Sequence, residues 1–188
     1  MNGGKPSKNN RYFWKWASTM FNKVDYSRIK TIGPDHAAAE WLLMCGARVQ
    51  YRSGTDWITD FSELQKEFSK PDNYIQAIDA SESNIMHMGF EYLNGLRHIE
   101  SIKFYKCLYV EDICMKKLSA VRDSLNDLQL VSCGNVTDAG ILSIASLKNL
   151  KTLNLFDLPS VKDKTKCYWI LQKELPNCKI QFAGGENR

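Results

Sequence analysis

A four-unit repeat with a period near 25 residues constrains this chain more than any other feature of its sequence. Apolar residues recur in one frame: apolar-x-x-apolar-x-apolar-x-x, followed by a small or apolar residue. The units begin at Ile75, Ile99, Leu125 and Leu150, so that successive starts are 24, 26 and 25 residues apart. Such periods are typical of folds in which one supersecondary unit stacks on the next and a continuous core is buried between them.

The spacing inside each unit predicts a short strand followed by a helix. Alternate residues of a strand point to opposite faces, so the apolar positions would face the core and the intervening positions would face solvent. Cys107 and Cys133 occupy the last position of the frame, where a small side chain fills the turn. Thr137 and Asp138 then suit a helix N-cap and a first-turn acid. The helix that follows would pack three apolar side chains inward: Ile141, Ile144 and Leu147.

This pattern is that of leucine-rich repeats, whose unit is 20–29 residues long. We therefore expect an α/β fold over residues 74–188: a solenoid of about four repeats with short parallel strands on its concave face. Such repeats are generic binding scaffolds, so the pattern predicts a fold and not an activity.

The residues before the repeats predict a small helical domain at 12–73, behind a disordered basic tail at 1–11. Pro34 and Asp35 have the residue types of a helix start, and Gly46 is expected to end that helix. Four apolar residues between them share one helical face: Ala38, Trp41, Leu42 and Cys45. A second helical spacing precedes the break at 70–72 and comprises Trp57, Phe61, Leu64 and Phe68.

The net charge of +4 is unevenly distributed along the 188 residues. The first 24 residues hold five basic side chains and no acidic one, whereas the remainder holds one more acid than base. A charge this small does not indicate a nucleic-acid partner. The basic start is compatible with a mitochondrial targeting segment and equally with a solvated tail. No apolar run reaches the roughly 18 residues of a membrane-spanning helix.

Aromatic and basic residues are interleaved directly behind the tail. The candidate contact residues are Trp14, Lys15, Trp16 and Lys23. Aromatic rings at headgroup level with lysines toward anionic lipid would suit an inner-membrane surface. The same rings would equally suit the packing face of a helix docked on the body, because an isolated short helix is marginal. Exposure of the tryptophans distinguishes the two.

The sequence contains no motif that would support catalysis. P-loop, GxSxG and HExxH patterns are absent, and the six cysteines include no CxxC pair. The three histidines have no cysteine partners at zinc-site spacing. We therefore expect a protein that is not an enzyme.

Several strings carry a resemblance to a known family, from Arg11 to Pro176. They include Phe21-Asn22-Lys23-Val24-Asp25-Tyr26, Gly33-Pro34-Asp35, Cys45-Gly46-Ala47 and Ser132-Cys133-Gly134-Asn135-Val136-Thr137-Asp138. The chain resembles the mitochondrial ATP synthase subunit s family, also called coupling factor B or distal membrane-arm assembly component 2-like protein.

The resemblance implies a non-catalytic coupling or assembly factor. It would associate with the membrane sector of the proton-transporting ATP synthase, on the matrix side of the mitochondrial inner membrane, and support proton-driven ATP synthesis. Two alternatives remain open. One is an assembly factor for respiratory complex I, as in a paralogous branch. The other is a leucine-rich repeat adaptor of the ubiquitin-ligase type, which the turn at 133–138 favours although no F-box is found in the first 70 residues.

The resemblance also implies two sites. Members of the family hold a magnesium ion through a glycine and a threonine, which correspond to Gly46 and Ser81; serine keeps the oxygen ligand. The family's Cys-x-Cys pair corresponds to Tyr105-Lys106-Cys107, so Cys107 alone remains as a candidate functional thiol. A mechanism that needs two neighbouring thiols is therefore not expected, and Cys107 also has a structural role as a repeat residue.

Overall fold

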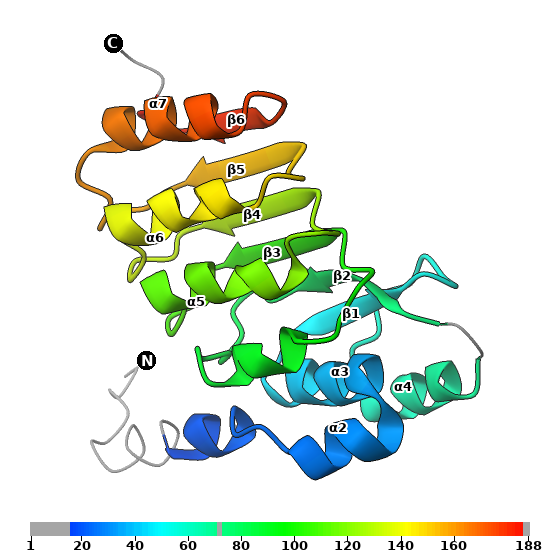
Figure 1. Ribbon diagram of the computed structural model, residues 1–188. Helices are drawn as coiled ribbons and strands as arrows, with labels where there is room; N and C mark the ends of the chain where they lie inside the picture. The colour runs from blue at the N-terminus through cyan, green and yellow to red at the C-terminus, as the bar shows by residue number, and fades with distance from the viewer. Residues whose placement is uncertain (1–15, 71–72, 186–188) are drawn as a thin grey trace, which may run out of the picture.

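The computed structural model describes residues 16–70 and 73–185, which form an α/β fold around one six-stranded sheet (Figure 1). The strands follow one another across the sheet in chain order. They are β1 (Arg48–Tyr51), β2 (Ile75–Asp79), β3 (Ser101–Tyr105), β4 (Asp127–Val131), β5 (Thr152–Phe156) and β6 (Lys179–Phe182). The α-helices are α2 (Tyr26–Ile32), α3 (Pro34–Met44), α4 (Phe61–Phe68), α5 (Asp112–Lys117), α6 (Asp138–Ser143) and α7 (Lys164–Glu174). Three short 3-10 helices are η1 (Gly89–Leu93), η2 (Leu118–Val121) and η3 (Ile144–Ser146).

Strands β2 to β6 are parallel and pair in the register that the sequence period predicts. One row of paired residues crosses the sheet: Ile78, Ile102, Leu128, Leu153 and Ile180. Every member of this row is buried. The α/β class is therefore confirmed, and the apolar positions of the repeating frame form the core side of the sheet.

The turn after each repeating strand has the same unusual backbone. Among the described residues, the non-glycine positions with positive φ are Glu82, Lys106, Ser132 and Asp157, with φ between 48° and 56°. Each lies one residue before the final position of the repeating frame. A left-handed conformation is unfavourable for a residue with a Cβ, so its recurrence shows that the turn geometry belongs to the repeat.

The helices after β3, β4 and β5 lie on one side of the sheet (Figure 1). Thr137 caps α6 by accepting a hydrogen bond from the Ala139 amide, and Asp138 is the first-turn acid, as expected. The three side chains predicted to point inward, Ile141, Ile144 and Leu147, are fully buried.

The N-terminal region contains a strand that the sequence does not predict. α3 begins after Gly33 and ends before Cys45 and Gly46, as expected, but 48–51 is β1 and pairs antiparallel with β2. Only Val49 and Tyr51 alternate inward along it, which is too short a pattern to distinguish from a loop. Trp57 also lies outside α4. Because β1 joins the sheet of the repeats, the predicted division between 73 and 74 crosses paired strands; it stays a prediction.

A buried asparagine attaches the first described helical segment, 16–21, to the body. Asn22 is completely buried. Its side-chain oxygen accepts hydrogen bonds from Trp41 Nε1 at 3.2 Å and from the Met86 amide at 2.7 Å. Its side-chain nitrogen donates to the Asn84 carbonyl at 2.9 Å. The segment thus docks through specific polar contacts. The expected tail at 1–11 lies outside the described residues.

Candidate functional site

The two residues that the family resemblance assigns to magnesium each lie two residues beyond the paired ends of β1 and β2. Arg48 pairs with Asp79 in the antiparallel register of β1 and β2. Extending that register by two residues places Gly46 opposite Ser81. A hydrogen bond of 2.8 Å from the Asn84 amide to the Cys45 carbonyl holds the two loops together. The structure therefore places two positions that are 35 residues apart in the sequence at the same end of one strand pair.

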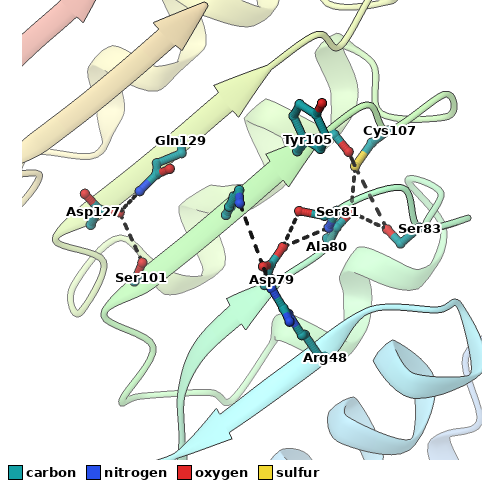
Figure 2. Close-up of polar contacts among 11 residues, drawn as sticks. Arg48, Asp79, Ala80, Ser81, Ser83, Ser101, Tyr105, Cys107, Asp127 and Gln129 are labelled. Atoms are coloured by element: carbon teal, nitrogen blue, oxygen red, sulfur yellow. Dashed lines mark hydrogen bonds and ion pairs between the residues drawn. The ribbon is translucent and has the colours of Figure 1, made fainter. Parts of the chain in front are cut away.

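A buried carboxylate, Asp79, lies at the centre of this junction (Figure 2). Its Oδ2 accepts hydrogen bonds from Arg48 Nη2 at 2.7 Å and Nε at 3.1 Å, and Lys103 Nζ lies 3.9 Å away. Its Oδ1 accepts from the amide and the hydroxyl of Ser81. Burial by itself raises the pKa of Asp79, but the hydrogen bonds from Ser81 and Arg48 outweigh it and hold the pKa below its usual range.

The atoms available as ligands at this junction are of the type that magnesium prefers. Gly46 and Ser81 offer only oxygen atoms as ligands, which is the chemistry that Mg²⁺ prefers, and waters commonly complete its shell. Asp79 is the nearest carboxylate, and it is already paired with Arg48. Within 16–70 and 73–185 there is no group of three or more His, Cys, Asp and Glu side chains placed to hold a metal. An ion here would therefore be bound by few protein atoms.

Cys107 lies next to this junction and is buried in the turn after β3. Its Sγ donates a hydrogen bond to the Ala80 carbonyl at 2.8 Å and lies 4.0 Å from Ser83 Oγ (Figure 2). Interaction with the neighbouring Cys133 thiol is the main cause that lowers the pKa of Cys107, and the same interaction raises the pKa of Cys133. At 1% exposure the thiol is closed to solvent. A functional role for it stays a prediction.

The sequence gives no signal for the Arg48–Asp79 pair or for a second polar cluster on the sheet. Asp127 accepts hydrogen bonds from Ser101 Oγ at 3.1 Å and from Gln129 Nε2 at 3.3 Å (Figure 2). It also accepts one from Thr152 on the next strand. These residues occupy solvent-side positions of the frame, which the apolar pattern leaves unspecified. Their polar side chains tie three adjacent strands together.

The predicted N-terminal contact residues are only partly within the described chain. Trp14 and Lys15 lie outside it, whereas Trp16 is 61% exposed and Lys23 is also exposed. Further apolar side chains on the same segment are exposed: Met20, Phe21 and Tyr26. The segment buries its small and polar residues, Ala17, Ser18 and Asn22, whereas its large apolar side chains are the more exposed ones. No helix among the described residues is long and apolar enough to cross a membrane.

Comparison with known proteins places the chain in a family. No family model matches it. It is similar to the mitochondrial ATP synthase subunit s of Rattus norvegicus, with 48% identity over 94% of this chain and 89% of the rat protein. The human protein of the same name is 44% identical over the same shares. A more distant relative, the distal membrane arm assembly component 2 of Drosophila melanogaster, is 23% identical over 83% of this chain and 56% of the fly protein. On the high identity along almost the whole chain, we conclude that the chain belongs to the mitochondrial ATP synthase subunit s family.

Proposed function

We propose that the protein is a non-catalytic coupling or assembly factor of the mitochondrial proton-transporting ATP synthase. It would bind peripherally to the membrane sector, on the matrix side of the inner membrane, and support proton-driven ATP synthesis. The observation that carries this proposal is the 44–48% identity to proteins named ATP synthase subunit s across 94% of the chain. That identity includes both the N-terminal region and the repeats.

The sheet supports a role as a binding scaffold. We propose that β2 to β6 and their helices form a leucine-rich repeat solenoid, since the strands keep a 24–27-residue register and the turns repeat one backbone conformation. Tyr105, Val131 and Phe156 are paired side by side on the solvent side of β3, β4 and β5. This apolar row at the carboxyl ends of the strands would contact the partner subunit.

The N-terminal segment supports a contact with anionic lipid. Trp16, Met20, Phe21 and Tyr26 form an exposed apolar surface, and Lys23 lies among them. Amphipathic aromatic rings beside lysines favour the interface of a bilayer rich in acidic headgroups. In this arrangement Asn22 fixes the segment to the body, and the aromatic side chains are left for the membrane.

Submitochondrial fractionation and co-purification with the ATP synthase test the main proposal. We expect the protein in the inner-membrane fraction, released by alkaline carbonate and retained with the enzyme in mild detergent. A protein found only in the cytosol and never with the enzyme would contradict it.

Sedimentation with vesicles of cardiolipin and phosphatidylcholine tests the lipid contact. Reversing Lys15 and Lys23 to Glu should weaken binding by about 30-fold at low salt, since each lysine near an anionic surface contributes about 1 kcal/mol. The matched control reverses Lys66 and Lys116, which are exposed elsewhere. Equal binding of the two variants, or binding that high salt does not weaken, would contradict the lipid contact.

We also propose that Gly46 and Ser81 hold a magnesium ion. The ion would act as a structural clamp between β1 and β2, with Asp79 orienting the Ser81 hydroxyl. Addition of Mg²⁺ should raise the melting temperature of the wild-type protein. The Ser81→Ala variant tests whether the hydroxyl is the ligand, and the Ser119→Ala variant, at an exposed serine, is its control. An equal Mg²⁺ response in wild type and in Ser81→Ala would contradict a role for the hydroxyl.

A second candidate function is assembly of the distal membrane arm, which the likeness to the fly protein favours. Deleting the protein from cells separates the two functions. Loss of assembled ATP synthase activity with intact respiratory complexes supports the first, and the converse supports the second.

A further inference from the structure

The outer face of α7 carries a row of lysines with a tryptophan among them. Lys166, Trp169 and Lys173 follow at spacings of three and four, which places them on one side of the helix. Lys162 precedes the helix on the connecting loop. All four are exposed, whereas Cys167 and Leu171 bury the other side of the helix. We refer to the set as the α7 stripe: Lys162, Lys166, Trp169 and Lys173.

The α7 stripe lies in a basic C-terminal region, although the net charge of the whole chain is small. Residues 148–179 hold seven lysines and three acids, whereas residues 25–147 hold five more acids than bases. Among the described residues, no ion pair within 4.0 Å involves Lys162, Lys166 or Lys173. The neighbouring pair of Lys148 and Glu174 neutralises a different side of α7. The stripe therefore presents three positive charges on one side of the molecule.

Solubility of the last repeat does not account for this composition. A terminal unit needs a polar outer surface, but charges of mixed sign provide it with less repulsion. Asp163 caps α7 and accepts a hydrogen bond from the Lys166 amide, but α7, like α2, has no acid within its first turn, where α3, α4, α5 and α6 each have one. Lysines there oppose the helix dipole, and an exposed tryptophan adds nothing to solubility. Lysines near a helix start together with an exposed tryptophan depart from the usual pattern of a helix surface, and such departures are typical of functional surfaces.

We infer that the α7 stripe is a docking surface for an acidic segment of a partner protein. Trp169, 38% exposed and placed between two lysines, would be the apolar anchor that the partner covers. The lysines around it would attract carboxylates and accelerate association. The helix of 11 residues is about 16 Å long, which matches two to three turns of a partner helix or a short extended strand.

The position of α7 favours a protein over a membrane. α7 packs by β6 at one end of the sheet, and the segment 16–21 lies by the opposite end (Figure 1). Five strand spacings separate β1 from β6, which is about 24 Å. A bilayer that covers only the end of the sheet near the N-terminal segment therefore leaves α7 at the far end. This step rests on the proposed lipid contact; the charge pattern does not.

Photo-crosslinking in isolated mitochondria tests the inference. The full chain carries Trp169→p-benzoyl-phenylalanine, and the cross-linked peptides are identified by mass spectrometry. We expect a peptide from another protein with several acidic residues near the attachment point. Combining the probe with Lys162→Glu, Lys166→Glu and Lys173→Glu should lower the cross-link yield about tenfold or more, since opposed charges are replaced by like charges.

The matched control reverses Lys66, Arg97 and Lys116, which are exposed away from α7, and should keep the full yield. Thermal melting within about 2 °C of wild type shows that both variants fold. Cross-links to lipid, to a second copy of this chain or to a peptide without acids would overturn the inference, as would no cross-link or equal yields in the two variants. Co-purification with the ATP synthase is measured in parallel. A failed cross-link with intact co-purification refutes the α7 surface alone, whereas failed co-purification refutes the proposed function.

Discussion

The repeats and the N-terminal region are held together by different kinds of contact. In the repeats, the same apolar position recurs on neighbouring strands, and its members, such as Leu128 and Leu153, are completely buried. The region from 16 to 70 has no such recurrence. It shares the apolar core, for instance where Trp41 packs against Phe90 and Tyr92, and it adds single polar contacts over long separations. Asn22 contacts residues up to 64 positions away, and the Tyr92 hydroxyl accepts from the Asp25 amide at 2.9 Å.

This difference indicates which residues of each region tolerate substitution. A repeat distributes its stability over many equivalent contacts with neighbours, so its outer residues are free to vary. The N-terminal region adds individual buried polar atoms to its apolar core. Two others, Tyr51 Oη and His36 Nε2, have no hydrogen-bond partner among the described residues. Removing the hydrogen-bonded side chain of Asn22 should therefore lower the free energy of unfolding almost as much as truncating a core leucine. The following predictions test that comparison.

Leu128→Ala should have the largest effect, a loss of about 4 kcal/mol in the free energy of unfolding. The leucine lies in the middle of the sheet, and its removal leaves a cavity between two paired strands. Gln129→Ala, on the solvent side of the same strand, should change stability by less than about 1 kcal/mol. Urea unfolding measures both. Similar losses at the two positions would show that the periodic core does not dominate.

Asn22→Ala should lower the free energy of unfolding by about 3 kcal/mol. It leaves Trp41 Nε1, the Met86 amide and the Asn84 carbonyl without their buried partner. The exposed Asn177→Ala is the control. A loss below about 1 kcal/mol for Asn22→Ala would show that the hydrogen bonds of Asn22 contribute little to the stability of this region.

Asp79→Asn should lower stability at neutral pH by about 1–2 kcal/mol, because Arg48 and Ser81 lose a charged acceptor. The folded pKa of Asp79 is lowered, so its contribution is complete above the ordinary aspartate pKa of about 3.9 and is lost as the pH falls through the folded pKa. Melting temperatures of wild type and variant should therefore converge in acid. Asp123→Asn, at an exposed carboxylate, should show no such convergence. A constant difference at every pH would assign the effect to packing.

Tyr51→Phe should have the smallest effect, below about 0.5 kcal/mol and stabilising if it is measurable. Its hydroxyl is buried without a partner among the described residues, so its removal relieves a desolvation cost. Tyr92→Phe loses the bond from Asp25 and should cost about 1 kcal/mol. A larger loss at Tyr51 than at Tyr92 would reveal a bond that Tyr51 makes, for instance to a buried water.

Much of the sheet was predictable because its signal is local and repeated. The alignment of Ile102, Leu128 and Leu153 follows from counting residues, and the start of α3 follows from Pro34 and Asp35. β1 was not predictable, because four residues with two inward side chains do not establish a period. The roles assigned to Gly46 and Ser81 come only from the family resemblance, and their placement at one end of a strand pair depends on the pairing of β1 with β2.

The sequence by itself determined the period, and with it the α/β class, the register of the parallel strands and the family. These depend on residue types at fixed separations, which are visible along the chain. Only the tertiary structure decided that β1 completes the sheet, that Asn22 anchors the first helix, and that Arg48 and Lys103 neutralise Asp79. The contacts of Asn22 with Met86 and of Arg48 with Asp79 join residues 64 and 31 positions apart with no repeated spacing, whereas Lys103 reaches Asp79 across the 24-residue register of β2 and β3. They therefore emerge only when the strands and helices are packed together.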